Sequence, residues 1–89
     1  MASTKSDLNL ANGSWTDLIA TYGDMASVAS FVQNKSPGDL LVNFSASGSA
    51  PSGSDGMLLR SKETAFGTAA HIWVKSLVGG GTVACGLTD

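Results

Sequence analysis

The chain has 89 residues, and its seven acidic and five basic residues give a formal net charge of −2. Nucleic-acid binding depends on clustered lysines and arginines that neutralise phosphates, so the scattered basic residues here argue against a nucleic-acid partner. Hydrophobic residues make up 43% of the chain, which excludes a disordered protein, whereas charged residues reach only 13%, about half of the usual share. Small neutral polar residues supply the remaining surface, and such a surface suits a protein that packs closely against others.

Residues 1–15 are polar, and the longest apolar runs are far shorter than the roughly 18 residues of a membrane span. We therefore expect no signal peptide and no membrane partner, and a protein that is made in a reducing cytoplasm and is not secreted. Cys85 is the only cysteine, so it cannot form an internal disulfide. Its apolar neighbours at a spacing of two predict a small core residue.

The N-terminal segment, residues 1–13, contains few core candidates beyond Leu8 and Leu10. It is predicted to be an extended arm that precedes a single β-sandwich domain at residues 14–89. As a hypothesis, the arm pairs with a neighbouring subunit by strand addition.

One segment competes as a helix. Its large side chains lie at positions i, i+3, i+4 and i+7, namely Trp15, Leu18, Ile19 and Tyr22. Because Thr16, Ile19 and Thr21 are β-branched and a two-turn helix is marginal alone, we expect a strand or a single helical turn.

Elsewhere the apolar residues alternate with a period of two, which is the spacing of β-strands. The predicted strands cover residues 28–33, 40–45, 57–60, 71–75 and 82–87. Phe31 and Phe44 are the aromatic core candidates, and residues 79–81 are predicted to form a hairpin turn. Short strands with closely spaced turns predict an all-β fold, a small antiparallel β-sandwich or jelly-roll-like barrel of about six to eight strands.

Residues 47–56 read SGSAPSGSDG and could be a linker, a phosphate-binding loop or a loop within one domain. Neither half of so short a chain could fold alone without metals or disulfides, which excludes a linker. Ser54 and Asp55 follow Gly53 where a phosphate-binding loop requires Lys and then Ser or Thr. We therefore predict a loop between two strands of one domain, stiffened by Pro51.

No catalytic or metal-binding constellation is present in the sequence. His71 is the only histidine, no G-x-S-x-G motif occurs, and one histidine with one cysteine does not make a metal site. We expect no enzyme and no cofactor. A small hydrolase is the least supported alternative, and it would lose turnover in the variant His71→Ala.

The strand at residues 71–75 places Ile72 and Val74 on one face and His71, Trp73 and Lys75 on the other. An amphipathic ring on a polar face often marks a contact surface. The alternative is a sandwich strand whose second face is covered by a loop. The sequence leaves both open.

Several short motifs follow one another in a recognisable order: Val32-Gln-Asn34, Gly38–Val42, Ala50-Pro51, Asp55-Gly56, Leu58-Leu59, His71–Lys75 and Thr82–Ala84. This order resembles that of small virion proteins of tailed bacteriophages and covers residues 28–86. The resemblance implies a small β-sandwich that serves as a capsid decoration (cement) protein or as a head–tail accessory subunit. It brings no catalytic residues, and the N-terminal third does not match it.

We therefore expect a non-enzymatic virion protein that binds and stabilises an assembled capsid or head–tail lattice. Its expected partners are the major capsid protein or another virion protein and further copies of itself, with no small-molecule substrate. The expected contact residues are Leu8, Leu10, Trp15, Pro51, Asp55, His71, Trp73 and Lys75. The alternative is a small carbohydrate-binding β-sandwich module that stacks sugars on Trp15, Tyr22 or Trp73.

Overall fold

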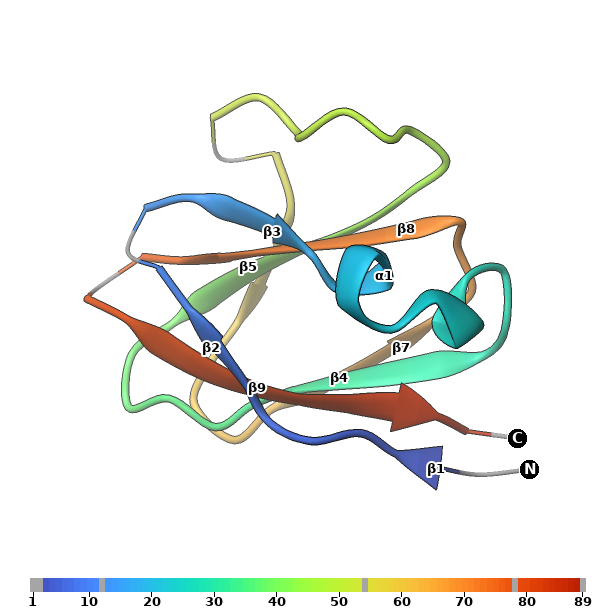
Figure 1. Ribbon diagram of the computed structural model, residues 1–89. Helices are drawn as coiled ribbons and strands as arrows, with labels where there is room; N and C mark the ends of the chain where they lie inside the picture. The colour runs from blue at the N-terminus through green and yellow to red at the C-terminus, as the bar shows by residue number, and fades with distance from the viewer. Residues whose placement is uncertain (1–2, 12, 54, 78, 89) are drawn as a thin grey trace.

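Alternating apolar residues build two antiparallel sheets that pack face to face (Figure 1). The computed structural model describes residues 3–11, 13–53, 55–77 and 79–88. The five-stranded sheet contains β1 (Ser3–Thr4), β2 (Leu8–Leu10), β9 (Gly81–Leu87), β4 (Ser30–Asn34) and β7 (Thr64–Gly67). The four-stranded sheet contains, in spatial order, β3 (Trp15–Asp17), β8 (His71–Ser76), β5 (Leu40–Ser45) and β6 (Met57–Leu59). The predicted all-β sandwich is confirmed.

The end strands of the two sheets decide which edges are open. In the five-stranded sheet, β1 and β2 follow one another along the same side of β9, and the order continues through β4 to β7. Because β1 and β2 share one place beside β9, the nine described strands fill eight places in the two sheets. A short turn links β6 to β7, so these two end strands lie on the same side of the sandwich.

The core lies between the sheets, where the inward residues of each strand are fully buried. Its members include Val32, Val42, Ile72, Val74, Val83 and Cys85. Helix α1 (Leu18–Thr21) and the 3₁₀ helix η1 (Gly23–Met25) add Leu18 and Met25 to this core. Cys85 is a core residue, as predicted, and its burial raises the pKa of the thiol to about 11.

The segment at residues 15–22 combines both of its predicted structures. Trp15–Asp17 is strand β3, and the chain then turns into α1. Asp17 caps this helix because its carboxylate Oδ1 accepts a 3.0 Å hydrogen bond from the Ile19 backbone N–H.

The N-terminal segment differs from the expected arm. Within residues 3–11, β1 and β2 pair with β9 of the same chain, with Leu8 opposite Val83 and Leu10 opposite Gly81. Leu10 is only 5% exposed, and Leu8 packs against the core. Two leucines at a spacing of two are enough to hold a short strand on the sandwich, so this segment is an edge of the fold. Residues 1, 2 and 12 lie outside the described residues.

The glycine-rich turn at residues 79–81 is not the predicted hairpin, because β8 and β9 belong to different sheets. The Ser76 hydroxyl donates to the Gly79 carbonyl over 2.6 Å, and the connection then crosses between the sheets. A Cβ at Gly81 would lie 2.9 Å from the Ser36 hydroxyl oxygen, so this crossing needs a glycine.

Of the two aromatic residues predicted for the core, only Phe44 packs against it. Phe44 is half-buried and packs against the core. Phe31 lies outside the core, because the inward residues of β4 are Ser30, Val32 and Asn34. Because Ser30 and Asn34 are polar, the hydrophobic pattern alone predicts that Phe31, and not these two residues, faces the core.

Candidate functional site

The outer face of the four-stranded sheet collects most of the expected contact residues. Its strand register sets three rows across the sheet. The first row runs Trp15, Lys75, Leu41 and Leu58, the second Asp17, Trp73 and Asn43, and the third His71 and Ser45. Ile72 and Val74 face the core, so the two faces predicted for β8 are confirmed.

A loop covers this face. Residues 46–53 and 55–56, called the strap below, pass along the β3–β8 side of the sheet (Figure 1). The side-chain amide of Asn43 donates to the Asp55 carbonyl over 2.7 Å. The Trp73 indole Nε1 donates to the Ser47 carbonyl over 3.2 Å, and the Lys75 ammonium donates to the Gly53 carbonyl over 3.1 Å. The half-buried Trp73 therefore lies on a sheet face that a loop covers. This is the alternative to an open contact surface that the sequence left open.

The strap passes close above Trp15. A Cβ at Gly56 would lie 3.0 Å from the Val42 carbonyl oxygen and 3.2 Å from the outer ring carbon of Trp15. The Lys75 ammonium nitrogen lies over the same ring, 5.6 Å from its centroid, which is a cation–π distance. Stacking of a sugar on Trp15 or Trp73 would require the strap to move away.

His71 is held by an acidic neighbour at the far end of the same face. Its Nδ1 donates to Asp17 Oδ2 over 2.7 Å, and its ring stacks on Trp73 with a centroid distance of 6.5 Å. A histidine that activates a serine needs the serine hydroxyl at its second nitrogen. The register partner Ser45 accepts the Ser47 backbone N–H on its hydroxyl oxygen over 2.9 Å, and among the described residues His71 has no hydrogen bond to a serine. A Cβ at Gly48 of the strap would lie 3.5 Å from His71 Nε2, so His71 lies beneath the strap.

Metal-binding and membrane-spanning features are absent from the described part of the chain. No three histidine, cysteine or acidic side chains there come close enough to hold a metal ion. Neither of the two short helices approaches the length and apolar character that a membrane crossing requires.

A second surface, which the sequence interpretation missed, lies where β6 and β7 form the ends of their sheets. We call these two strands the open edge. Its apolar side chains are strongly exposed, with Met57 and Leu58 at 50% and Phe66 at 70%. A groove of about 290 Å³ runs between them, lined by Met57, Leu58, Leu59, Glu63, Thr64, Ala65 and Phe66.

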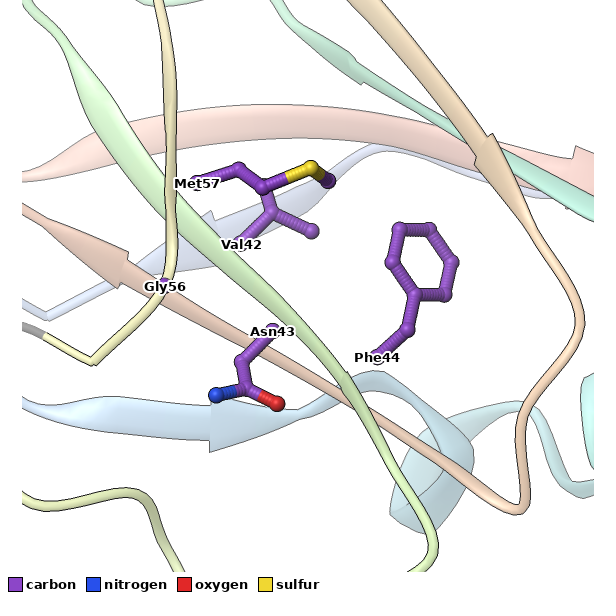
Figure 2. Close-up of a pocket in the computed structure, with 5 residues that line it drawn as sticks. All are labelled: Val42, Asn43, Phe44, Gly56 and Met57. Atoms are coloured by element: carbon purple, nitrogen blue, oxygen red, sulfur yellow. The ribbon is translucent and has the colours of Figure 1, made fainter.

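A second hollow adjoins this groove at Met57. It has a volume of about 280 Å³ and is lined by Val42, Asn43, Phe44, Gly56 and Met57 (Figure 2). In Figure 2 the side chains of Phe44 and Met57 lie on one side of β5, whereas Asn43 points to the other side, where the strap is. The open edge and the strap are therefore joined through Gly56 and Met57.

The edge strands of the two sheets differ in how they are protected. Near β1 and β2, Lys5 pairs with Asp24 over 2.5 Å and Lys35 pairs with Asp7 over 2.6 Å. Natural β-proteins commonly protect sheet edges from association with charged residues or prolines. Strands β6 and β7 have neither, because their sequences are MLL and TAFG. The open edge is therefore unprotected.

The structure brings together six of the eight expected contact residues. Trp15, Pro51, Asp55, His71, Trp73 and Lys75 all belong to the covered face or to the strap. Leu8 and Leu10 lie apart from them on β2 and pack on the core. The sequence signal for the open edge was the run of apolar residues from Met57 to Leu59 without a charge, directly after a glycine.

In comparisons with known proteins, no family model, no curated protein and no solved structure matches this chain.

Proposed function

We propose that this chain is a non-enzymatic structural subunit of a bacteriophage virion that binds an assembled capsid or head–tail lattice through its open edge. Two arguments support the proposal. The first is the resemblance of residues 28–86 to small virion proteins of tailed phages. The second, which carries it, is the exposure of Phe66 at 70% beside the half-exposed Met57 and Leu58.

Burial of these side chains would supply the free energy of binding. Full burial of a large apolar side chain is worth about 1.5–3 kcal/mol, and exposed apolar patches on natural proteins usually mark interaction sites. Phe66 also stands directly opposite Phe31 across the β4–β7 pair, so a second, half-buried aromatic ring extends the patch. Strands β6 and β7 themselves carry no charged residue, whereas the turn between them presents Arg60, Lys62 and Glu63.

Electron microscopy of purified virions provides the direct test. Particles made with and without this protein are compared, and a difference density that fits the 33 × 25 × 18 Å sandwich is expected on the lattice. If the two reconstructions are identical, the proposal is wrong.

A pair of matched variants then tests the open edge. Phe66→Ser is expected to weaken binding to virions lacking the protein by at least about tenfold, because it removes a central aromatic anchor. Val28→Ser is the control, because Val28 is also an exposed apolar residue but does not line the groove of the open edge. Equal binding by both variants in a co-sedimentation assay would contradict a role for the open edge.

A further inference from the structure

We propose that Met57 is a modification site: hydrogen peroxide oxidises its thioether to a sulfoxide in the free subunit, and the sulfoxide weakens docking of the open edge. The effect on docking rests on the proposed function, whereas the selective oxidation of Met57 does not. Methionine sulfoxide is reduced back to methionine by dedicated reductases, so the change is reversible.

The sulfur-containing side chains of the described residues differ in their exposure. Met57 is 50% exposed, whereas Met25 and Cys85 are both 0% exposed and belong to the core. Burial raises the pKa of the Cys85 thiol to about 11, so at neutral pH this group is the unreactive thiol and not the thiolate. Among these three residues, peroxide therefore reaches the thioether of Met57 first.

The oxidation of Met57 is a two-electron step. A lone pair of its Sδ attacks one oxygen of hydrogen peroxide, so that an S–O bond forms and the O–O bond breaks. The sulfur loses two electrons, and the second peroxide oxygen leaves as hydroxide. This hydroxide takes the proton from the sulfur-bound oxygen, and the products are the sulfoxide and one water molecule.

The position of Met57 connects this reaction to the open edge. Met57 lines the groove of the open edge and also the adjoining hollow, in which Figure 2 shows it on the same side of β5 as Phe44. Oxidation replaces an apolar thioether with a polar group. In the free subunit, water can hydrogen-bond to the sulfoxide oxygen. Docking of the open edge would remove that water, which is unfavourable for a polar group without a new partner.

The fold should survive oxidation at Met57 but not at Met25. Met57 belongs to an end strand, and half of its side chain is already in contact with solvent. Met25 lies on η1 and is completely buried in the core, where a sulfoxide would disrupt the packing. A mild treatment that oxidises Met57 and spares Met25 therefore changes the surface of the protein alone.

Peptide mass spectrometry of the full chain during treatment with hydrogen peroxide tests the site. The sulfoxide is expected to form at least about tenfold faster at Met57 than at Met25, because only Met57 is exposed. The chain unfolded in urea is the control, since both side chains are then exposed and the two rates should agree within about twofold. A folded chain in which Met57 oxidises no faster than Met25 would overturn the inference.

Co-sedimentation with virions lacking the protein tests the effect on docking. Wild type oxidised at Met57 is expected to bind at least about tenfold more weakly than untreated wild type, and to recover after treatment with methionine sulfoxide reductases. Met25→Leu keeps a core side chain of similar size and should lose as much binding on oxidation as wild type does. Met57→Leu is compared only with its own untreated sample, and peroxide should change its binding less than about twofold.

The outcomes separate this inference from the proposed function. If untreated wild type does not bind virions, the lattice function is contradicted, and the oxidation rates of Met57 and Met25 still decide whether Met57 is the modification site. If untreated and oxidised wild type bind equally well, the lattice function stands and the effect of oxidation on docking is wrong.

Discussion

The side-chain amide of Asn34 donates to the backbone carbonyl of Leu59 over 2.9 Å, and this bond joins the two sheets from inside the core. Asn34 is completely buried, and its amide also donates to the Gly38 carbonyl over 2.8 Å. Its own carbonyl oxygen accepts the Ser36 backbone N–H over 2.8 Å. A buried amide with these three partners fixes where β6 sits relative to β4.

Replacement of this residue should therefore be costly. Asn34→Ala is expected to lower the free energy of unfolding by about 2–4 kcal/mol, because it leaves buried backbone groups unpaired and opens a cavity. Urea unfolding followed by tryptophan fluorescence measures the change. The control is Gln33→Ala, whose half-buried side chain makes one long hydrogen bond of 3.4 Å and should cost less than about 1 kcal/mol. Equal losses in the two variants would contradict the role given to Asn34.

The strap should loosen when the indole hydrogen bond of Trp73 is removed. Trp73→Phe keeps an aromatic ring but leaves the Ser47 carbonyl without its donor, a loss of about 0.5–1.5 kcal/mol. Cleavage within residues 46–56 by a nonspecific protease is then expected to be roughly two- to tenfold faster. Tyr22→Phe is the matched control, since it removes a 2.7 Å hydrogen bond to the Ser6 carbonyl, which is not part of the strap. A strap cleaved at the wild-type rate in both variants would show that this bond does not hold it.

The close approach at Gly56 should not tolerate a side chain. Gly56→Ala places a methyl group 3.0 Å from the Val42 carbonyl oxygen, and overpacking of this kind costs about 1–3 kcal/mol. Gly48→Ala is the control, because its added Cβ would lie at an ordinary 3.5 Å from His71 Nε2. Thermal unfolding of both variants tests the difference, and a melting temperature for Gly56→Ala equal to that of Gly48→Ala would be inconsistent with it.

Cys85 should make stability fall in alkaline solution. Desolvation by burial raises the pKa of its thiol from 9.0 to about 11, an effect that the Lys5 cation partly offsets and Asp7 reinforces. Between these values the unfolded chain ionises at Cys85 while the folded chain does not. Stability is therefore unaffected below pH 9 and decreases toward pH 11, by at most about 1.4 kcal/mol per pH unit.

Unfolding in urea at several pH values measures this slope. Cys85→Ala is expected to be less stable at pH 7 because of the cavity it leaves, but to lose less stability between pH 9 and pH 11 than wild type. A parallel decline of the two proteins would contradict the assignment to Cys85.

The strands predicted most clearly are those whose inward residues are large and apolar. Leu40 to Ser45 and His71 to Ser76 show this alternation, and Met57–Leu59 was identified as a short apolar run. Strand β7 was missed because its one large apolar residue, Phe66, points to solvent. A short stretch of sequence does not show that these residues form a strand, since their pairing partner β4 lies some thirty residues away.

The candidate sites, too, could be predicted only where they depend on local spacing. The sequence identified residues 47–56 as a loop and placed His71, Trp73 and Lys75 on one face, because both depend on local spacing. It could not show that the loop covers that face, since this depends on how β3, β8 and β5 lie side by side. The exposure of the open edge was hidden for a related reason, because it depends on which strands end each sheet.

The position of β9 determines when the sandwich can form during synthesis. This strand, which lies between β4 on one side and β1 and β2 on the other, contains residues 81–87. A ribosome that has released only residues 1–80 from its tunnel holds a chain whose five-stranded sheet lacks its central member. Native pairing of the first residues must wait for residues more than seventy positions later, so the five-stranded sheet forms only after β9 has been synthesised.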